Sequence, residues 1–249
     1  MELRIIVSWP THPAYFMLYF ILLFPLFLVL PQLYVFLLSL TGIPPRLSSI
    51  LGTLLFWASL LFSFFNIVIK EIETGQTRIT FETKYVSFMG MYFPIIHPRI
   101  VRDKIIIAVN IGGALIPGIL SLVLLAHMLY MPSLLLKTVL IIFGVALITY
   151  YFSRAIPGVG IVVPGILPPL ASVVLTLLLV GEPHFSVPVA YIGGTLGSLL
   201  GADIIRLFRD LDRFVYRYGS TMLSIGGAGT FDGIFLSGVF AVLFILLFI

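Results

Sequence analysis

The sequence lacks cysteine and is poor in charge, and these two absences exclude several classes of protein. Without cysteine there are no disulfides and no thiolate metal sites. The four histidines are scattered, which argues against a classical zinc site. Only 10% of the residues are charged, against about 25% in soluble domains. The basic residues flank hydrophobic runs, as membrane anchors do, so we predict no nucleic-acid partner. We also predict no cofactor.

Apolar residues make up 60% of the 249 residues, more than a water-soluble fold could hide, so lipid is the predicted solvent. A membrane-spanning helix needs about 20 apolar residues. The polar start, Met1–Pro13, lacks a signal-peptide cleavage site. We therefore predict an all-α polytopic membrane protein, one transmembrane domain over residues 1–249. Its seven predicted spans cover about 14–40, 49–69, 104–128, 134–153, 162–181, 187–208 and 225–249.

The basic residues fall almost entirely on one side of these seven spans. Twelve of the fourteen lie on the side of the N-terminus, and only Arg46 and Lys137 lie on the other. Short loops rich in Lys and Arg stay in the cytoplasm. The distribution predicts a cytoplasmic N-terminus and an external C-terminus.

Three segments depart from simple spans and turns. Gln76–Tyr85 alternates polar and apolar residues and predicts a strand that pairs with Val86–Phe93, a small cytoplasmic β-hairpin within an insertion of about 71–103. Residues 206–219 form an amphipathic segment that either anchors the chain on anionic headgroups or gates a substrate. Ile156–Pro169 has four prolines and three glycines, which predicts an interfacial loop or a re-entrant segment.

Asp203 and Asp232 are the only acidic residues within the predicted spans. A carboxylate at the centre of a membrane helix costs roughly 2.5–3.5 kcal/mol on insertion scales, so its presence needs a reason. Span six ends just after Asp203 and span seven begins just before Asp232. The two carboxyl groups are therefore predicted at similar depth, near the cytoplasm, on consecutive antiparallel spans.

Three interpretations of the two aspartates remain open. As a catalytic pair they would share a proton, one activating water while the other protonates the leaving group. As structural residues, Asp203 would pair with Arg206 one turn later and Asp232 would cap the last helix. As a binding site they would hold a proton or a small ion.

Other polar or small residues are candidates for the same cavity. Gly227 and Gly229 would let a substrate backbone approach closely. Asn110 either bonds to another helix or lines the cavity, and Asn66 is predicted to be interfacial. The face Gly193, Gly197 and Gly201 permits close helix packing, and a homo-oligomer remains open. Further candidates are Thr230, Thr195, Ser198 and Ser224.

Four sequence segments together resemble the prokaryotic membrane-protein family catalogued as domain of unknown function 1614. They are IAVNIGGALIP (107–117), PGVGIVVPGILPP (157–169), GTLGSLLGAD (194–203) and SIGGAGTFDGIFLSG (224–238). The resemblance implies the plasma membrane of a prokaryote but implies no activity.

A looser likeness is to the presenilin and signal-peptide-peptidase class of intramembrane aspartyl proteases. Those enzymes carry one aspartate on span six and another after a G-x-G-D motif on span seven, which Asp203 and Asp232 match in order and side. Here the second motif is G-x-G-x-x-D, and Ala202 stands where the class has tyrosine before its first aspartate. The likeness implies peptidase activity on membrane-embedded peptides only by analogy.

The residues thus leave three functions. An intramembrane aspartyl peptidase would need the two carboxyl groups within roughly 5–7 Å of each other. An ion- or proton-coupled transporter or channel would need a polar path to the outside. The segment 156–169 and the glycine-rich stretch 226–233 favour this function, because they interrupt regular helix. A non-catalytic scaffold would keep its function without either carboxylate.

Overall fold

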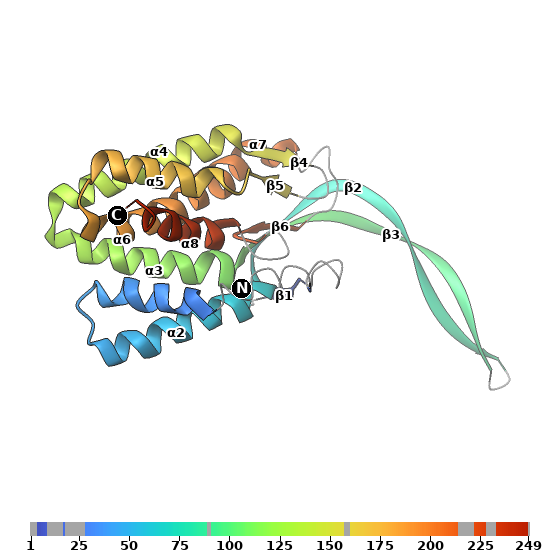
Figure 1. Cartoon of the computed structure of the whole chain (residues 1–249). Coiled ribbons are helices and arrows are strands. Elements are labelled where there is room, and N and C mark those ends of the chain that lie inside the picture. Colours follow the sequence, from blue (N-terminus) through green and yellow to red (C-terminus); the bar gives the residue numbers. More distant parts are fainter. Residues whose placement is uncertain are drawn as a thin grey trace.

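The computed structural model describes residues 4–8, 17, 28–88, 91–156, 160–213, 222–227 and 233–248. Helices predominate and lie side by side as a bundle, from which a long two-stranded ribbon projects (Figure 1). The bundle consists of the helix Leu28–Ser39, α2 (Pro45–Leu61), α3 (Ile116–His127), α4 (Pro132–Phe152), α5 (Leu167–Leu179), α6 (Pro183–Ser198) and α8 (Gly233–Ile245).

Four helices of the described residues are long and apolar enough to cross a membrane. Including the tighter or wider turns at their ends, they are Pro45–Phe64, Ile111–Tyr130, Pro132–Phe152 and Pro183–Leu211. Three shorter apolar helices accompany them, Leu28–Ser39, Leu167–Leu179 and Gly233–Ile245. The chain therefore has the architecture of a helical membrane protein, as its composition predicts.

The connections between helices alternate between two ends of the bundle (Figure 1). At one end, the sheet end, lie the strands of the described residues and the short helix α7 (Arg206–Arg213). At the opposite end, short connections at 40–44, 128–131 and 180–182 join successive helices. The opposite end also carries Arg46 and Lys137, within the first two turns of α2 and α4.

A four-stranded sheet covers the sheet end, in the order β1 (Ile5–Val7), β2 (Phe65–Phe88), β3 (Met91–Asn110) and β6 (Met222–Ile225). The first three strands run antiparallel, and β6 runs parallel to β3. Beyond β1 and β6, strands β2 and β3 continue as the ribbon, with Ile79 opposite Ile100. A second, two-stranded sheet pairs β4 (Arg154–Ile156) with β5 (Gly160–Val162).

The extent of the sheet corrects the prediction of an all-α protein with one small hairpin. Residues 65–69 and 104–110, predicted as parts of spans two and three, are paired strands, and Ile225, predicted at the start of span seven, ends β6. These runs are rich in Ile and Val, which favour strands, but a short apolar run does not by itself distinguish a strand from a helix. The predicted hairpin residues lie farther out along the same ribbon, but the predicted pairing was wrong. Residues 77–85 pair with 94–102 and not with 86–93, because β2 continues to Phe88 before the chain reverses.

An aromatic cluster packs the helix Leu28–Ser39 against its neighbours in the bundle. Tyr34 is fully buried, and its ring centroid lies 5.9 Å from that of Phe56, 6.2 Å from that of Tyr191 and 6.3 Å from that of Phe235. These four residues come from the helix Leu28–Ser39, α2, α6 and α8. Each aromatic pair adds about 0.5–1.5 kcal/mol beyond its buried area, so the cluster holds four helices together.

The glycine face of α6 packs against α4 of the same chain. A methyl group added at Gly193 would lie 2.7 Å from Ile141, and one added at Gly197 would lie 2.6 Å from Val145. At Gly201 the same addition would meet the backbone of Ala146. The three glycines let the two helices approach more closely than any side chain would allow.

Candidate functional site

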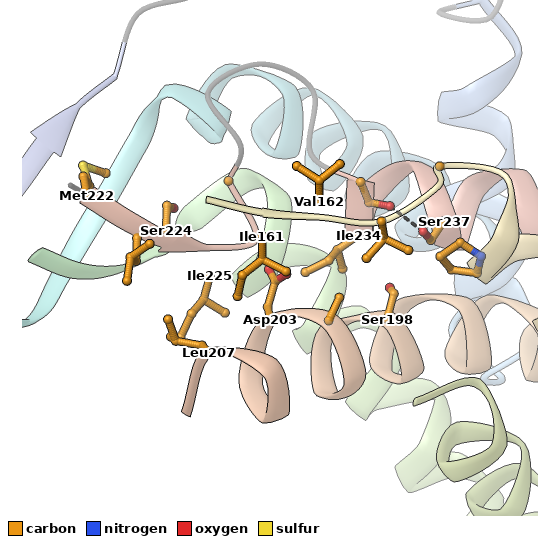
Figure 2. Close-up of a pocket in the computed structure, with 17 residues that line it drawn as sticks. Ile161, Val162, Ser198, Asp203, Leu207, Met222, Ser224, Ile225, Ile234 and Ser237 are labelled. Atoms are coloured by element: carbon orange, nitrogen blue, oxygen red, sulfur yellow. Dashed lines mark hydrogen bonds between the residues drawn. The ribbon is translucent and has the colours of Figure 1, made fainter. Parts of the chain in front are cut away.

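A cavity of about 190 Å³ opens at the sheet end of the bundle (Figure 2). Three stretches that are far apart in the sequence surround it: the segment around β5, the C-terminal end of α6 with the turns that follow, and β6 with the start of α8. The lining residues are Ile161, Val162, Val163, Gly165, Pro168, Ser198, Ala202, Asp203, Leu207, Met222, Leu223, Ser224, Ile225, Gly227, Gly233, Ile234 and Ser237.

Most of the lining residues belong to three of the segments that carry the family resemblance. Described residues of 157–169, 194–203 and 224–238 each line part of the cavity, and Leu207, Met222 and Leu223 lie just outside those segments. The fourth segment, 107–117, lies directly behind, because its Ala114 packs against Gly226. Segments separated by more than a hundred residues therefore meet at one place, which makes the cavity the candidate functional site.

Asp203 contributes the carboxylate of this cavity (Figure 2). It lies on a π-helical segment, Leu199–Ile205, that continues α6 into α7. Its Oδ2 accepts a hydrogen bond of 2.5 Å from the backbone N–H of Gly226. π-Helical turns are rare and often mark functional sites, because the extra residue redirects the side chains that follow.

The ion pair predicted between Asp203 and Arg206 does not form. Arg206 pairs instead with Asp210, one turn further on, with 2.6 Å between Nε and Oδ2. Asp210 lies on α7 and is buried, so its negative charge needs a nearby cation. Asp203 is instead held by a backbone donor from a different element.

Gly226 makes that backbone contact possible. Its φ of +75° lies in the left-handed region, where residues with a side chain are strained. A methyl group at this position would also lie 2.8 Å from the backbone nitrogen of Ala114. The chain can therefore leave β6 and turn toward Asp203 only with glycine here.

A polar network behind the cavity joins three strands of the sheet. The Nδ2 of Asn110 donates to the Ser63 carbonyl at 2.6 Å and to the Oδ1 of Asn66 at 3.1 Å. The Oδ1 of Asn66 also accepts from the Ser224 hydroxyl at 2.6 Å. The Oδ1 of Asn110 accepts from the Gly113 N–H at 2.7 Å, at the start of the third bundle helix.

Asn66 is buried in the protein and not solvated as its predicted interfacial position implies, because only 1% of it is exposed. The strand register determines its place, since it sets Asn66 opposite Asn110. A pair of asparagines 44 positions apart gives no periodic signal in a single sequence.

The predicted site residues occupy distinct positions. Asp203 and Gly227 line the cavity, whereas Gly201 faces α4 and Asn110 lies behind the wall in the polar network. Asp232, Gly229 and Thr230 lie outside the described residues. Gly233, which follows Asp232 in the chain, lines the cavity. Of the predicted hydroxyls, Ser198 and Ser224 line it, and Ser237 was not predicted.

The described residues contain no group of three or more His, Cys, Asp or Glu side chains that could hold a metal ion. The polar groups that they bring to the cavity are one carboxylate and three serine hydroxyls, on otherwise apolar walls. Such a set can bind a proton, accept hydrogen bonds from a ligand, or activate water.

The fold and this cavity define a helical membrane protein with a carboxylate-containing site at one end of its bundle. The chain belongs to the family described as "Protein of unknown function (DUF1614)", whose model matches residues 60–244. The matched region includes every residue that lines the cavity. A search of the curated proteins found no match, and neither did a search of the solved structures.

Asn110→Ala is expected to destabilise the protein by about 2–3 kcal/mol, because it removes the hydrogen bonds of Asn110 to the Ser63 carbonyl, to Asn66 and to the Gly113 N–H. The measurement is the midpoint of thermal unfolding in detergent. Ser39→Ala removes an exposed side-chain hydrogen bond to the Phe36 carbonyl. It should change the free energy of unfolding by no more than about 0.5 kcal/mol and leave the midpoint close to that of the wild type. Equal effects of the two substitutions would contradict a structural role for the network.

Proposed function

We propose that this protein is an intramembrane aspartyl peptidase that uses Asp203 and Asp232 and opens its site toward the cytoplasm. The observation that carries the proposal is the Asp203 carboxylate, which faces a cavity whose wall includes Gly233, the neighbour of Asp232. Water and a peptide bond both need access to the carboxyl groups, and a cavity at the end of the bundle supplies it.

The topology we propose has seven spans with the sheet end in the cytoplasm. The helix Leu28–Ser39, α5 and α8 would complete the four longer helices, at some cost in local bilayer thinning. The orientation is supported by charge, since the opposite end carries only Arg46 and Lys137. Asp203 then lies near the cytoplasmic ends of the spans.

The proposed chemistry is hydrolysis of a peptide bond. The ionised carboxylate takes a proton from water as the water oxygen adds to the carbonyl carbon, and the protonated carboxyl gives its proton to the carbonyl oxygen. Collapse of this diol, with proton transfer to the amide nitrogen, breaks the C–N bond and yields an acid and an amine. The Gly226 N–H would hold Asp203 in place throughout.

The wall formed by β6 also supports a peptide substrate. Within the described residues, β6 is the outer strand of its sheet, and all four of its residues line the cavity. The unpaired edge of a strand offers backbone donors and acceptors to an extended peptide. A substrate must unwind locally before its peptide bond can be attacked, and such an edge would hold it unwound.

The test is cleavage of a pool of synthetic single-span peptides by the protein reconstituted in liposomes, with products identified by mass spectrometry. Asp203→Asn and Asp232→Asn are each expected to lower the rate by about 10³-fold. Glu182→Gln removes an exposed carboxylate at the opposite end and should leave the rate unchanged. Cleavage that persists in both aspartate variants would overturn the proposal. The proposal would also be overturned if the wild-type protein cleaved none of the peptides and if cells with the wild type and cells with the Asp203→Asn, Asp232→Asn double variant had the same membrane proteome.

Ion- or proton-coupled transport is the second candidate, and buried hydroxyls favour it. The Tyr34 and Tyr191 hydroxyls lie 3.4 Å apart inside the bundle. Toward the opposite end, however, the described hydroxyls of Ser121 and Thr138 donate to carbonyls of their own helices, which weighs against their serving an ion path. Proton flux into liposomes that depends on Asp203, without peptide cleavage, would favour transport. If the variant that carries both Asp203→Asn and Asp232→Asn kept its full function, a non-catalytic scaffold would be the remaining interpretation.

A further inference from the structure

We propose that the surface where α4 meets α7 is a binding site for the phosphate group of an anionic phospholipid. Figure 1 shows α7 beside the sheet-end terminus of α4 and next to β4. The site lies apart from the cavity and involves neither proposed catalytic aspartate. Its residues come from the end of α4, the start of β4 and α7.

Two arginines of α7 share one aromatic ring of α4. The guanidinium carbons of Arg206 and Arg209 lie 5.7 Å and 5.5 Å from the ring centroid of Tyr150. Arg206 is fixed and neutralised by Asp210, while Arg209 is exposed. Stacking on the ring holds the exposed guanidinium in a defined place, where its planar donors suit the oxygens of a phosphate.

Arg154 adds a second exposed cation where α4 passes into β4, four positions after Tyr150. Among the described side chains, the cations of α7 and of the start of β4 are Arg154, Arg206 and Arg209, and the carboxylate is that of Asp210. The described side chains therefore leave an excess of positive charge. Such a cluster attracts anionic lipid headgroups.

The outer face of α4 provides a path for an acyl chain. Leu140, Phe143, Leu147 and Tyr151 recur at helical spacing, and each is more than half exposed. The stripe ends at Tyr151, three positions before Arg154. Phe208 on α7 is 68% exposed and extends the apolar surface beside Arg209. An apolar stripe that ends in cations matches an amphiphile with an anionic head, rather than free phosphate.

The length of the helix that runs from α6 into α7 puts this corner at headgroup depth. The helix Pro183–Leu211 has 29 residues, which at about 1.5 Å per residue make about 44 Å. The hydrocarbon layer is about 30 Å thick. The α7 part of the helix therefore extends beyond the hydrocarbon, among the phosphates.

The test is native mass spectrometry of the detergent-purified full chain with dioleoyl phosphatidylglycerol or dioleoyl phosphatidylcholine. The wild type is expected to bind the anionic lipid about tenfold more tightly, and Arg154→Gln with Arg209→Gln should remove that preference. Arg46→Gln with Lys137→Gln removes the same charge at the opposite end and should keep it. An unchanged thermal midpoint checks that each variant is folded.

Three outcomes would overturn the proposal. They are equal binding of both lipids by the wild type, a preference that survives in the Arg154 and Arg209 double variant, and an equal loss in the Arg46 and Lys137 control. Displacement of the bound lipid by millimolar inorganic phosphate would show a site for the anion alone and would also contradict it. Phe208→Ser keeps every charge and should weaken the binding of both lipids by a similar factor.

Discussion

Gly226→Ala is expected to destabilise the protein by about 3–5 kcal/mol, enough to prevent most of it from folding. Two independent penalties add at this residue. The backbone is in the left-handed region, and the new methyl group would lie 2.8 Å from a backbone nitrogen of Ala114 that belongs to a π-helical turn and has little room to move. The yield of monodisperse protein after gel filtration and the thermal midpoint measure the loss.

Gly75→Ala separates the two penalties. Gly75 also has a left-handed φ, of +72°, but nothing lies within 4 Å of the position that its methyl group would take. Only the conformational penalty remains, about 1–2 kcal/mol. If Gly226→Ala lost no more stability than Gly75→Ala, the close approach of Gly226 to Ala114, in the turn before α3, would not exist in the protein.

Gly201→Ala is expected to cost a similar amount, about 3–4 kcal/mol, and to remove any activity that depends on Asp203. The added methyl group would lie 2.8 Å from the carbonyl carbon of Ala146 on α4. Because backbone cannot yield as a flexible side chain does, the π-helical segment must move away from α4. That movement would pull Asp203, two residues later, from the Gly226 N–H.

The matched control is Gly118→Ala on α3, where the methyl group would meet nothing within 4 Å. Alanine favours helix over glycine by about 1 kcal/mol, so this variant should be as stable as the wild type or more so. Both variants are measured by thermal midpoint and by the activity assay. A stable Gly201→Ala variant that lacks activity would assign Gly201 to the site itself, and a fully active one would contradict the close packing.

The sequence predicts those features that depend on bulk solvation. Apolar runs such as 134–153 and 162–181 must leave water whatever their neighbours are, so hydropathy alone identifies them. The grouping of basic residues likewise needs no contact information. By contrast, residues 65–69 and 104–110 satisfy hydropathy as helix or as strand, and only pairing between them decides which one forms.

The candidate site divides along the same line. Asp203 stands out because a carboxylate in an apolar run is costly, and that signal is local. Its partner is not local, because the Gly226 N–H reaches it only through a turn that follows a strand. The nearby Arg206 is the better partner by spacing alone, but Asp210 competes for it. Rules based on spacing do not include such competition.

The sheet has a consequence for how the protein is made. Its strands come from residues 5–7, 65–110 and 222–225, so the four-stranded unit joins segments that are far apart in the sequence. During synthesis, the early helices can enter the membrane long before β6 leaves the ribosome. The wall of the cavity that β6 provides is therefore added after the helices that precede it. A chain made only as far as α7 cannot close its own site, and whatever chemistry the cavity performs begins only once β6 has joined the sheet.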